Sequence, residues 1–312
     1  MRGLFFFSLL CVLFLSCKTK RIPDKGNATV VEPELNYIPY YLTMYKADSL
    51  FLMDDFKGSY RLLDSLFKIY PPLDTDNYVE YSIYLNSAVM SGNVEDIEAK
   101  VRYGYRHFGG IVALHKNNYE MHIAVDSAAK LTETDIAQLK KEYANSLDHG
   151  LRERLRRMHD EDQAIRLNGG SYEEMGLIDD RNEKELENIF EEYGYPRKEL
   201  IGTSSAYDLP GERVGVVILF LHQSDEFKIK YLPILLDYVK KGQCDPETYA
   251  SVYDKFMLQT GRKQYFGSFT ASSDPDDISP VSNPMKLDSI RASIGLPPIK
   301  YYPWKLRAFD HD

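Results

Sequence analysis

An uninterrupted apolar run, Val214 to Leu221, most constrains how this 312-residue chain can fold. None of its eight residues carries a polar side chain, so the segment has to lie inside a core. Asp208-Leu209-Pro210 comes shortly before it, and a capping residue followed by an early proline is typical of a helix start. Because no alternating strands flank the run, we interpret it as a buried helix rather than a strand.

The polar residues directly after this run are the first candidates for a site. His222, Gln223 and Asp225 directly follow the end of a buried element, so we expect their side chains to lie close together. Ser224 and Asp225 would also suit the cap and the first turn of a following helix, which accounts for Asp225 without any function. The sequence leaves both interpretations open.

Length and composition allow two domains of ordinary size with a sizeable core, since 44% of the residues are hydrophobic. The formal charge of −9 argues against nucleic acid as a partner, because phosphate binding needs a basic face. The sequence contains no HExxH, no CxxC, no glycine-rich phosphate loop and no nucleophile elbow. We therefore predict no nucleic-acid partner and no cofactor.

The N-terminus carries a short apolar segment of the kind used for export. Arg2 precedes an apolar run from Leu4 to Leu15, which is shorter than the roughly 20 residues that a membrane-spanning helix needs. The ending LFLSC resembles a bacterial lipoprotein signal. The resemblance implies that residues 1–17 are a signal peptide and that Cys17 becomes the lipidated first residue; an ordinary signal peptide or an uncleaved anchor is the alternative.

The segment after the signal, residues 18–36, is polar, contains proline and glycine and shows no helical or strand period, which is typical of a flexible tether. Basic residues directly follow Cys17, and this favours a periplasm-facing protein of the bacterial cell envelope. Once Cys11 leaves with the signal and Cys17 carries lipid, Cys244 alone remains, so we predict no internal disulfide.

Apolar and aromatic residues between Tyr37 and Phe108 recur at helical spacing in two pairs of segments, with breaks at Asp55 and Asn93. The pairs resemble tetratricopeptide-like helical hairpins. The resemblance implies a module over residues 37–131 that presents a surface to a protein partner. A generic helical bundle is the alternative.

Start and stop signals divide residues 132–312 into further helices. Thr132 and Asp135 are spaced as a capping pair, and Asp148-His149-Gly150 is placed to split the following helical pattern in two. We also predict a helix that starts at Asp180 and ends at Gly194.

The last part of the chain shows other sequence patterns besides helical periodicity. A helix that starts at Asp245-Pro246 is expected to leave Asp254 and Lys255 outside its buried face. Lys263 to Thr270 alternates and is aromatic, so we predict a short β-hairpin, and Tyr301 to Trp304 is expected to form an apolar strap. The predicted fold is therefore mainly α: a tetratricopeptide-like helical-hairpin module, then a mostly helical domain with a short β-hairpin.

Short motifs spread over residues 151–302 resemble an uncharacterised bacterial family, a domain of unknown function. The matching positions are Asp162-Gln163-x-x-Arg166, Asp179-x-x-Asn182, Tyr193-Gly194-x-Pro196, His222-Gln223-x-Asp225, Asp254-Lys255, Gln264-Tyr265-Phe266-Gly267 and Arg291 with Gly295-Leu296. The resemblance implies no known activity. Lys255, Phe266 and Phe269 depart from the family pattern and have lost hydrogen-bonding capacity, which favours a structural role for part of these positions.

These motif positions supply the candidate polar cluster, which we expect to converge on one partly buried network with Arg166 paired to a carboxylate. Its members are Asp162, Gln163, Arg166, His222, Gln223, Asp225, Asp254, Lys255 and Gln264. An enzyme would use His222 as base, oriented by Asp225 or Asp254. A metal site would join His159, His222 and Asp225, but we assign neither a metal nor a catalytic residue.

The function that we predict is a lipid-anchored envelope protein, held to the membrane through Cys17, that acts as a protein-interaction or ligand-binding module. A hydrolase-type or metal-dependent enzyme that uses the polar cluster is the alternative.

Overall fold

The computed structural model describes residues 35–75, 79–203 and 214–309, which belong to one compact unit. Helices are the only regular elements of these residues, so the predicted mainly α fold is confirmed. The predicted signal peptide with Cys17, nearly all of the predicted tether and Asp208-Leu209-Pro210 lie outside the described residues. Among the helices that are described, none is long and apolar enough to cross a membrane.

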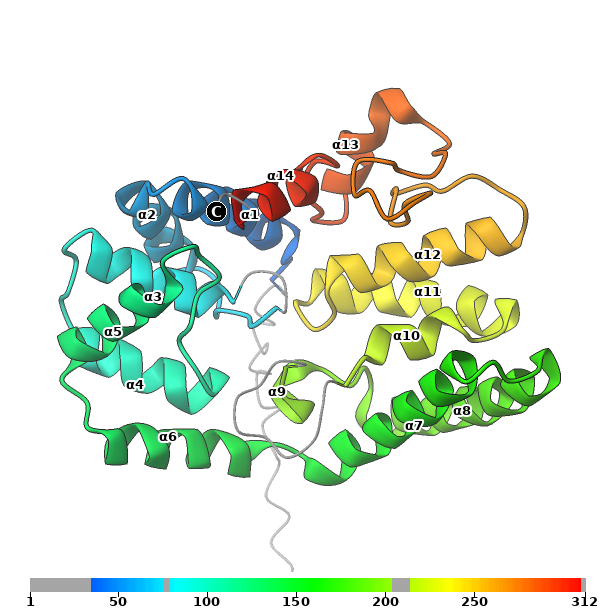
Figure 1. Cartoon of the computed structure of the whole chain (residues 1–312), viewed down its shortest axis with the longest axis horizontal. Coiled ribbons are helices and arrows are strands. Elements are labelled where there is room, and N and C mark those ends of the chain that lie inside the picture. The colour runs from blue at the N-terminus through cyan, green and yellow to red at the C-terminus, as the bar shows by residue number, and fades with distance from the viewer. Residues whose placement is uncertain (1–34, 76–78, 204–213, 310–312) are drawn as a thin grey trace, which may run out of the picture. The chain divides into compact units, whose positions relative to one another are not determined.

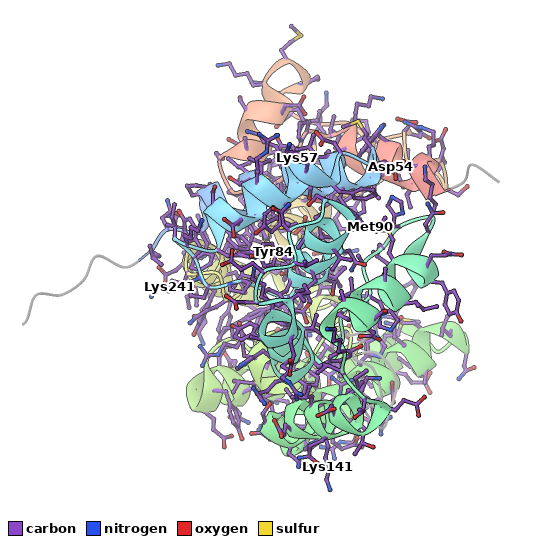
Figure 2. All side chains as sticks on the ribbon, turned by 90° about the vertical axis from the view of Figure 1, so that its left-hand side faces the viewer. Asp54, Lys57, Tyr84, Met90, Lys141 and Lys241 are labelled. Carbon is purple, nitrogen blue, oxygen red and sulfur yellow. The ribbon has the colours of Figure 1, made fainter. Side chains whose placement is uncertain are left out.

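The first part of the unit consists of antiparallel helix pairs and single helices (Figure 1). Its elements are α1 Ile38–Leu52, α2 Phe56–Leu66, α3 Glu80–Met90, α4 Ile97–Phe108, α5 Asn118–Ala129 and α6 Glu133–Ser146. α1 packs on α2, α2 on α3, and α4 on both α5 and α6. The two helix pairs therefore lie where the spacing predicts them, while their tetratricopeptide-like character stays a prediction. Figure 2 views this face, with Tyr84 and Met90 on α3.

The second part continues with longer helices and ends in short ones. Its elements are α7 His149–Leu167, α8 Tyr172–Tyr193, α9 Lys198–Ile201, α10 Val216–Leu221, α11 Asp225–Lys240, α12 Pro246–Gln259, the 3-10 turn η1 Pro284–Lys286, α13 Leu287–Ala292 and α14 Tyr301–Phe309. α7 lies along α8, and α11 lies along α12 (Figure 1). The last six residues of the central apolar run form helix α10, as predicted, although only Leu219 and Phe220 of them are fully buried.

Local capping explains where several helices begin. Thr132 and Asp135 form a reciprocal capping box at α6, and the Asp148 side chain caps α7, so the predicted split between these helices is confirmed. The predicted start at Asp180 is wrong, because α8 already begins at Tyr172. Ser171 and Glu174 form a capping box there, ahead of a first turn whose side chains are mostly exposed and therefore show little apolar period.

The predicted β-hairpin at Lys263–Thr270 is also wrong, since the described residues contain no strand. Gln264 and Thr270 make only isolated bridges, to Val281 and Ile278. The backbone N–H groups of Tyr265, Phe266 and Ser268 bond to the Asp254 side chain of α12 instead of a partner strand, as described below. The predicted strap at Tyr301–Trp304 is the start of helix α14, which packs on α1.

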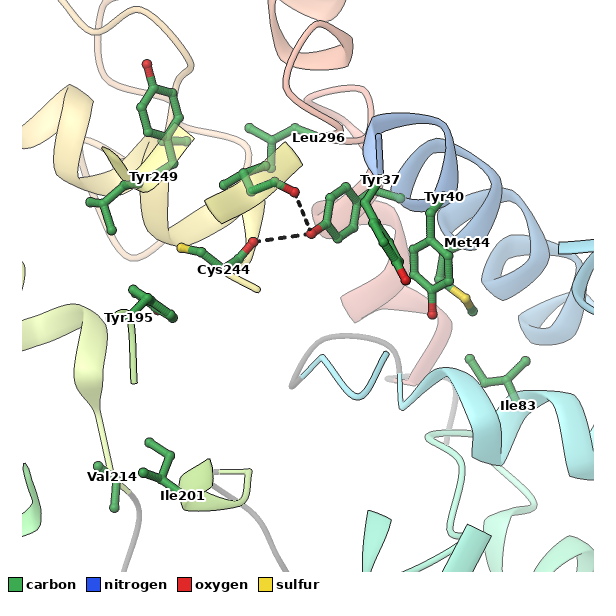
Figure 3. Close-up of a cluster of buried hydrophobic side chains, with 14 of the residues drawn as sticks. Tyr37, Tyr40, Met44, Ile83, Tyr195, Ile201, Val214, Cys244, Tyr249 and Leu296 are labelled. Atoms are coloured by element: carbon green, nitrogen blue, oxygen red, sulfur yellow. Dashed lines mark hydrogen bonds between the residues drawn. The ribbon is translucent and has the colours of Figure 1, made fainter. Parts of the chain in front are cut away.

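The hydrophobic core crosses the predicted boundary between residues 131 and 132. Tyr41 of α1 donates hydrogen bonds to the backbone oxygens of Val239, at 3.0 Å, and Cys244, at 3.3 Å (Figure 3). At the far end of the chain, the buried Lys305 pairs with the buried Asp48 of α1, with 2.8 Å between Nζ and Oδ2. Whether the two parts also fold separately stays a prediction.

Candidate functional site

Asp162 is the centre of the polar site. It follows Leu155 and Met158 on the buried face of α7, and its own side chain is fully buried. Nδ1 of His222 lies 2.9 and 3.0 Å from the two carboxylate oxygens of Asp162, and because a carboxylate only accepts, Nδ1 is the donor. Nε2 of Gln163 donates to the same carboxylate at 2.6 Å.

Arg166 completes this arrangement by joining two helices. Its Nη1 donates to Oδ1 of Asp162 at 2.8 Å, one helical turn back. Its Nη2 lies 2.7 and 2.9 Å from the two oxygens of Asp179 on α8. One guanidinium thus bridges a buried and a half-buried carboxylate, which is the geometry in which arginine is strongest. We call Asp162, Gln163, Arg166, Asp179 and His222 the Asp162 network.

The charge state of Asp162 follows from these contacts. Burial alone would raise its pKa, because a low-dielectric interior disfavours the charged form. Hydrogen bonds from His222 and Gln163, together with the charge of Arg166, outweigh burial and hold the pKa of Asp162 below its usual value. Asp162 is therefore an ionised group at neutral pH, oriented toward His222.

The turn between α10 and α11 carries His222 into the network and is itself tied to α8. The backbone N–H of Ser224 donates to Oε2 of Glu183 at 3.0 Å. The Ser224 hydroxyl accepts from the N–H of Phe227, so Ser224 caps α11 as the sequence indicates. His222, Gln223 and Ser224 are thereby held between α7 and α8.

Two buried amides, one on α8 and one at this turn, have atoms without a hydrogen-bond partner among the described residues. Asn182 is 1% exposed, and neither its Nδ2 nor its Oδ1 has a hydrogen bond within the described residues. Gln223 is 2% exposed; its Nε2 donates to the backbone oxygen of Leu219, and its Oε1 has no partner among the described residues. Such atoms are rare in native proteins, since an unsatisfied buried polar group costs about 1–3 kcal/mol.

Asn182 adjoins the network rather than lying elsewhere in the core. It comes one turn after Asp179 on the buried face of α8 and directly precedes Glu183, which binds the turn. Neither Asp179 nor Asn182 was among the candidates from the sequence. Their Asp-x-x-Asn spacing, which places both on one helix face, was the signal that could have found them.

The remaining candidates lie in a second polar group. Asp254 is fully buried and accepts from the backbone N–H groups of Tyr265 at 2.6 Å, Phe266 at 3.0 Å and Ser268 at 2.9 Å. The prediction that Asp254 lies outside the buried face of its helix is wrong, because the loop after α12 folds back over it.

The same loop binds two further side chains. Gln264 is fully buried, accepts from the N–H of Phe269 and donates to the backbone oxygens of Phe269 and Ser279. Arg291 donates to the backbone oxygens of Phe266 and Pro297. We call Asp254, Gln264 and Arg291 the Asp254 knot, in which each member forms hydrogen bonds with backbone groups.

Asp225 and Lys255 join neither group. Both are partly exposed, and neither makes a hydrogen bond or ion pair within the described residues. Asp225 is the first residue of α11, behind the Ser224 cap. The structure thus brings Asp162, Gln163, Arg166 and His222 together, with Gln223 beside them; it does not bring in Asp225, Asp254, Lys255 or Gln264.

The structure groups a different set of possible metal ligands from the one that the sequence suggests. His159 lies 3.4 Å from Asp160, between Nδ1 and Oδ1, and packs against Gly215, so it does not meet His222. Asp162, Asp179 and His222 do offer ligand atoms within 4.8 Å of one another. However, Arg166 already bonds both carboxylates, and a divalent cation would have to displace its guanidinium. The donor set therefore fits an organic ion pair better than a metal.

A cavity of about 1060 Å³ lies apart from this site. Its lining includes Tyr37, His107, Tyr195, Lys198, Val214 and Asp245. Helix α7 contributes His159 to it, and no member of the Asp162 network is among its lining residues. The polar site is thus a half-open cluster between helices and not the floor of this cavity.

Comparison with known proteins gives one match. The model of a family described as "Family of unknown function (DUF6624)" matches residues 150–309, a span that contains both the Asp162 network and the Asp254 knot. No curated protein and no solved structure matches the chain. The resemblance predicted for the second part of the chain is therefore confirmed.

Proposed function

Because the chain belongs to the family of unknown function DUF6624, whose description carries no activity, we propose its function from the site: it binds a small polar ligand at the Asp162 network. Asn182 carries the proposal. Both its donor and its acceptor are buried without a hydrogen-bond partner among the described residues, and a bound ligand would complete them. His222, Arg166 and Asp179 are each about a fifth exposed, so solvent reaches the network that this amide adjoins.

The charges around the site indicate the kind of ligand. Asp162 and Asp179 share a single guanidinium, Glu183 and Asp225 lie on the adjoining turns, and the amine of Lys228, with Lys255 near it, interacts with three of these carboxylates, so groups of both charges surround the site. The unsatisfied oxygens of Asn182 and Gln223 both accept hydrogen bonds. A neutral molecule that is rich in N–H or O–H donors fits these acceptors better than an anion does.

Asn182→Leu tests whether the amide serves a ligand or the fold. Leucine removes an unsatisfied polar group at similar volume, so we expect the free energy of unfolding of the ligand-free protein to rise, by about 1 kcal/mol or more. Asn86→Leu is the matched control. Asn86 is equally buried, but its Nδ2 donates to the backbone oxygens of Ser82 and Ile111, so this variant should be destabilised.

The measurement is urea denaturation of both variants, followed by native mass spectrometry of protein purified from membranes. We expect a small molecule that is retained by the wild type and lost from Asn182→Leu. If Asn182→Leu is destabilised as much as Asn86→Leu and the wild type retains nothing, Asn182 is a part of the fold and the proposal is wrong.

A hydrolase-type enzyme is the second candidate, favoured by the pair of His222 and Asp162. A histidine whose Nδ1 donates to a buried carboxylate has its Nε2 oriented for proton transfer. The Ser224 hydroxyl is engaged as a helix cap, so water would be the nucleophile. An enzyme of this kind would convert the retained molecule in the wild type but not in His222→Gln, as followed by mass spectrometry.

The location of the protein is a separate proposal. The short apolar segment and the LFLSC ending support a bacterial envelope protein that is anchored through lipid at Cys17 and faces the periplasm. An alkyne fatty acid fed to the producing cells should label the wild type and not Cys17→Ser; equal labelling of both would contradict it. A protein partner at residues 37–131, on the face seen in Figure 2, is supported only by the hairpin pattern.

A further inference from the structure

Lys228 is a fully buried amine on α11, adjacent to the site but used by neither candidate function. Its Nζ donates to the backbone oxygen of Gln223 and, at 2.9 Å, to Oε1 of Gln259. Both acceptors are neutral, and Lys228 has no carboxylate partner within the described residues. An ammonium has three N–H donors, whereas a neutral amine has two and a lone pair, so two acceptors match the neutral amine.

The charges that face Lys228 come from three helices. Burial is the largest influence and lowers its pKa to about 8, and the positive charge of Lys255 on α12 acts in the same direction. Asp225 on α11, and Asp179 and Glu183 on α8, act against this by favouring the ammonium. A desolvated lysine beside a second cation is the environment in which an amine becomes a nucleophile near neutral pH.

Gln259 controls access to this amine. It is the last residue of α12 and is itself exposed, while its side chain caps Nζ of Lys228. Rotation of this single side chain at a helix end uncovers Nζ and leaves the bond to the Gln223 oxygen in place. Lys228 is therefore shielded by a side chain that can move without disturbing the core.

We propose that Lys228 is a carbonyl-reactive amine, which takes an aldehyde or ketone as a covalent imine. The lone pair of the neutral amine attacks the carbonyl carbon to give a carbinolamine. The two N–H protons then leave with the carbonyl oxygen as one molecule of water, and the C=N bond forms, so no oxidant or reductant is needed. This reactivity goes beyond the proposed ligand site, because it would persist even if Asn182 and Gln223 bound only water.

Competitive labelling of the full-length wild type tests the proposal. The protein is treated at pH 8 with limiting acetaldehyde and cyanoborohydride, which reduces an imine to a stable amine, and each lysine is quantified by peptide mass spectrometry. About half of an amine with a pKa near 8 is neutral at this pH, against less than about 1% of an unperturbed lysine. Since access through Gln259 reduces this advantage, we expect labelling of Lys228 to be about tenfold faster than labelling of the exposed Lys184 on α8.

Two variants test separately how the access of the aldehyde to Nζ and the pKa of Lys228 affect the labelling rate. Gln259→Ala should raise the labelling rate of Lys228 several-fold, because it removes the cover. Lys255→Gln should lower that rate about twofold or more at pH 8, because loss of a neighbouring positive charge raises the pKa of Lys228. The rate at Lys184 should not change in either variant.

Two results would overturn the proposal. In the first, Lys228 is labelled no faster than Lys184 in the native wild type and becomes reactive only in urea. In the second, Lys228 is labelled rapidly but neither variant changes its rate relative to Lys184. Lys228→Met identifies the labelled peptide, and circular dichroism of each variant verifies that the fold is retained.

Discussion

The Asp162 network and the Asp254 knot both have a fully buried aspartate at their centre, and they differ in what that aspartate binds. Asp254 accepts from backbone N–H groups, and no atom of the knot lacks a partner within the described residues. Asp162 accepts from three partly exposed side chains, beside the unsatisfied amide of Asn182 and the unsatisfied amide oxygen of Gln223. Both groups lie within the span that matches the family. The two groups therefore differ in the kind of partner that the aspartate binds. The Asp254 knot holds a loop, whereas the Asp162 network is the site that we propose for a ligand.

Asp254→Asn should have the largest effect on stability. An amide offers one acceptor where the carboxylate offers two, and its NH₂ group faces backbone N–H donors, so several buried donors lose their partner. We expect the free energy of unfolding to fall by roughly 3–5 kcal/mol. Urea denaturation measures it, with Asp237→Asn as the control for an exposed ion pair, which should cost less than about 1 kcal/mol. A loss that matches the control would show that the knot does not hold the loop.

Arg166→Gln should have an intermediate effect. Asp162 keeps its bonds from His222 and Gln163 but loses its cation, while the half-buried Asp179 can return to water. We expect a loss of roughly 2 kcal/mol, below the value for a fully buried pair. Arg181→Gln breaks an exposed pair with Glu161 and is the matched control, with an expected loss under about 1 kcal/mol. If Arg166→Gln and Arg181→Gln lose the same free energy of unfolding, the network contributes nothing to stability beyond an exposed ion pair.

The pH dependence of stability should single out Asp162. Its pKa is lowered in the folded protein, so its contribution is complete above the unfolded value near 3.9 and is lost as pH falls through the folded value. We expect stability to fall more steeply below about pH 4 in the wild type than in Asp162→Asn, by at most about 1.4 kcal/mol per pH unit. Urea denaturation at a series of pH values measures both slopes. Equal slopes would mean that Asp162 titrates alike in both states.

The sequence predicts the helices well because their start signals are local. The caps at Thr132, Asp148 and Ser224 each need only residues within one turn, and each lies where the pattern indicates. The site is different. His222 and Asp162 are 60 residues apart, and only the packing of α10 on α7 brings them into contact. No local rule could predict that His222 would choose Asp162 over Asp225 or Asp254.

The residues that the sequence analysis missed share one property: they are polar groups on faces that helical periodicity assigns to the core. Asn182 precedes Leu186 on the buried face of α8, and Lys228 lies beside Phe227 on the buried face of α11. Lys228 reads only as an interruption of an apolar pattern, whereas Asn182 lies in a motif position that was not carried into the candidate cluster. The burial of Asp254, which was itself a candidate, was missed for the opposite reason, because the loop after α12 covers a position that the helix alone leaves open.

Asp225→Asn should have the smallest effect on stability, and it connects the two proposals. Asp225 is partly exposed at the first turn of α11, where the interaction of its charge with the helix dipole stabilises the fold by less than about 1 kcal/mol. Its charge also favours the ammonium form of Lys228, so its removal should lower the pKa of that amine. We therefore expect urea denaturation to change little, while aldehyde labelling of Lys228 near pH 7 becomes faster. A loss as large as that of Arg166→Gln would place Asp225 inside the network. Unchanged labelling would show that the negative charge of Asp225 does not act on Lys228.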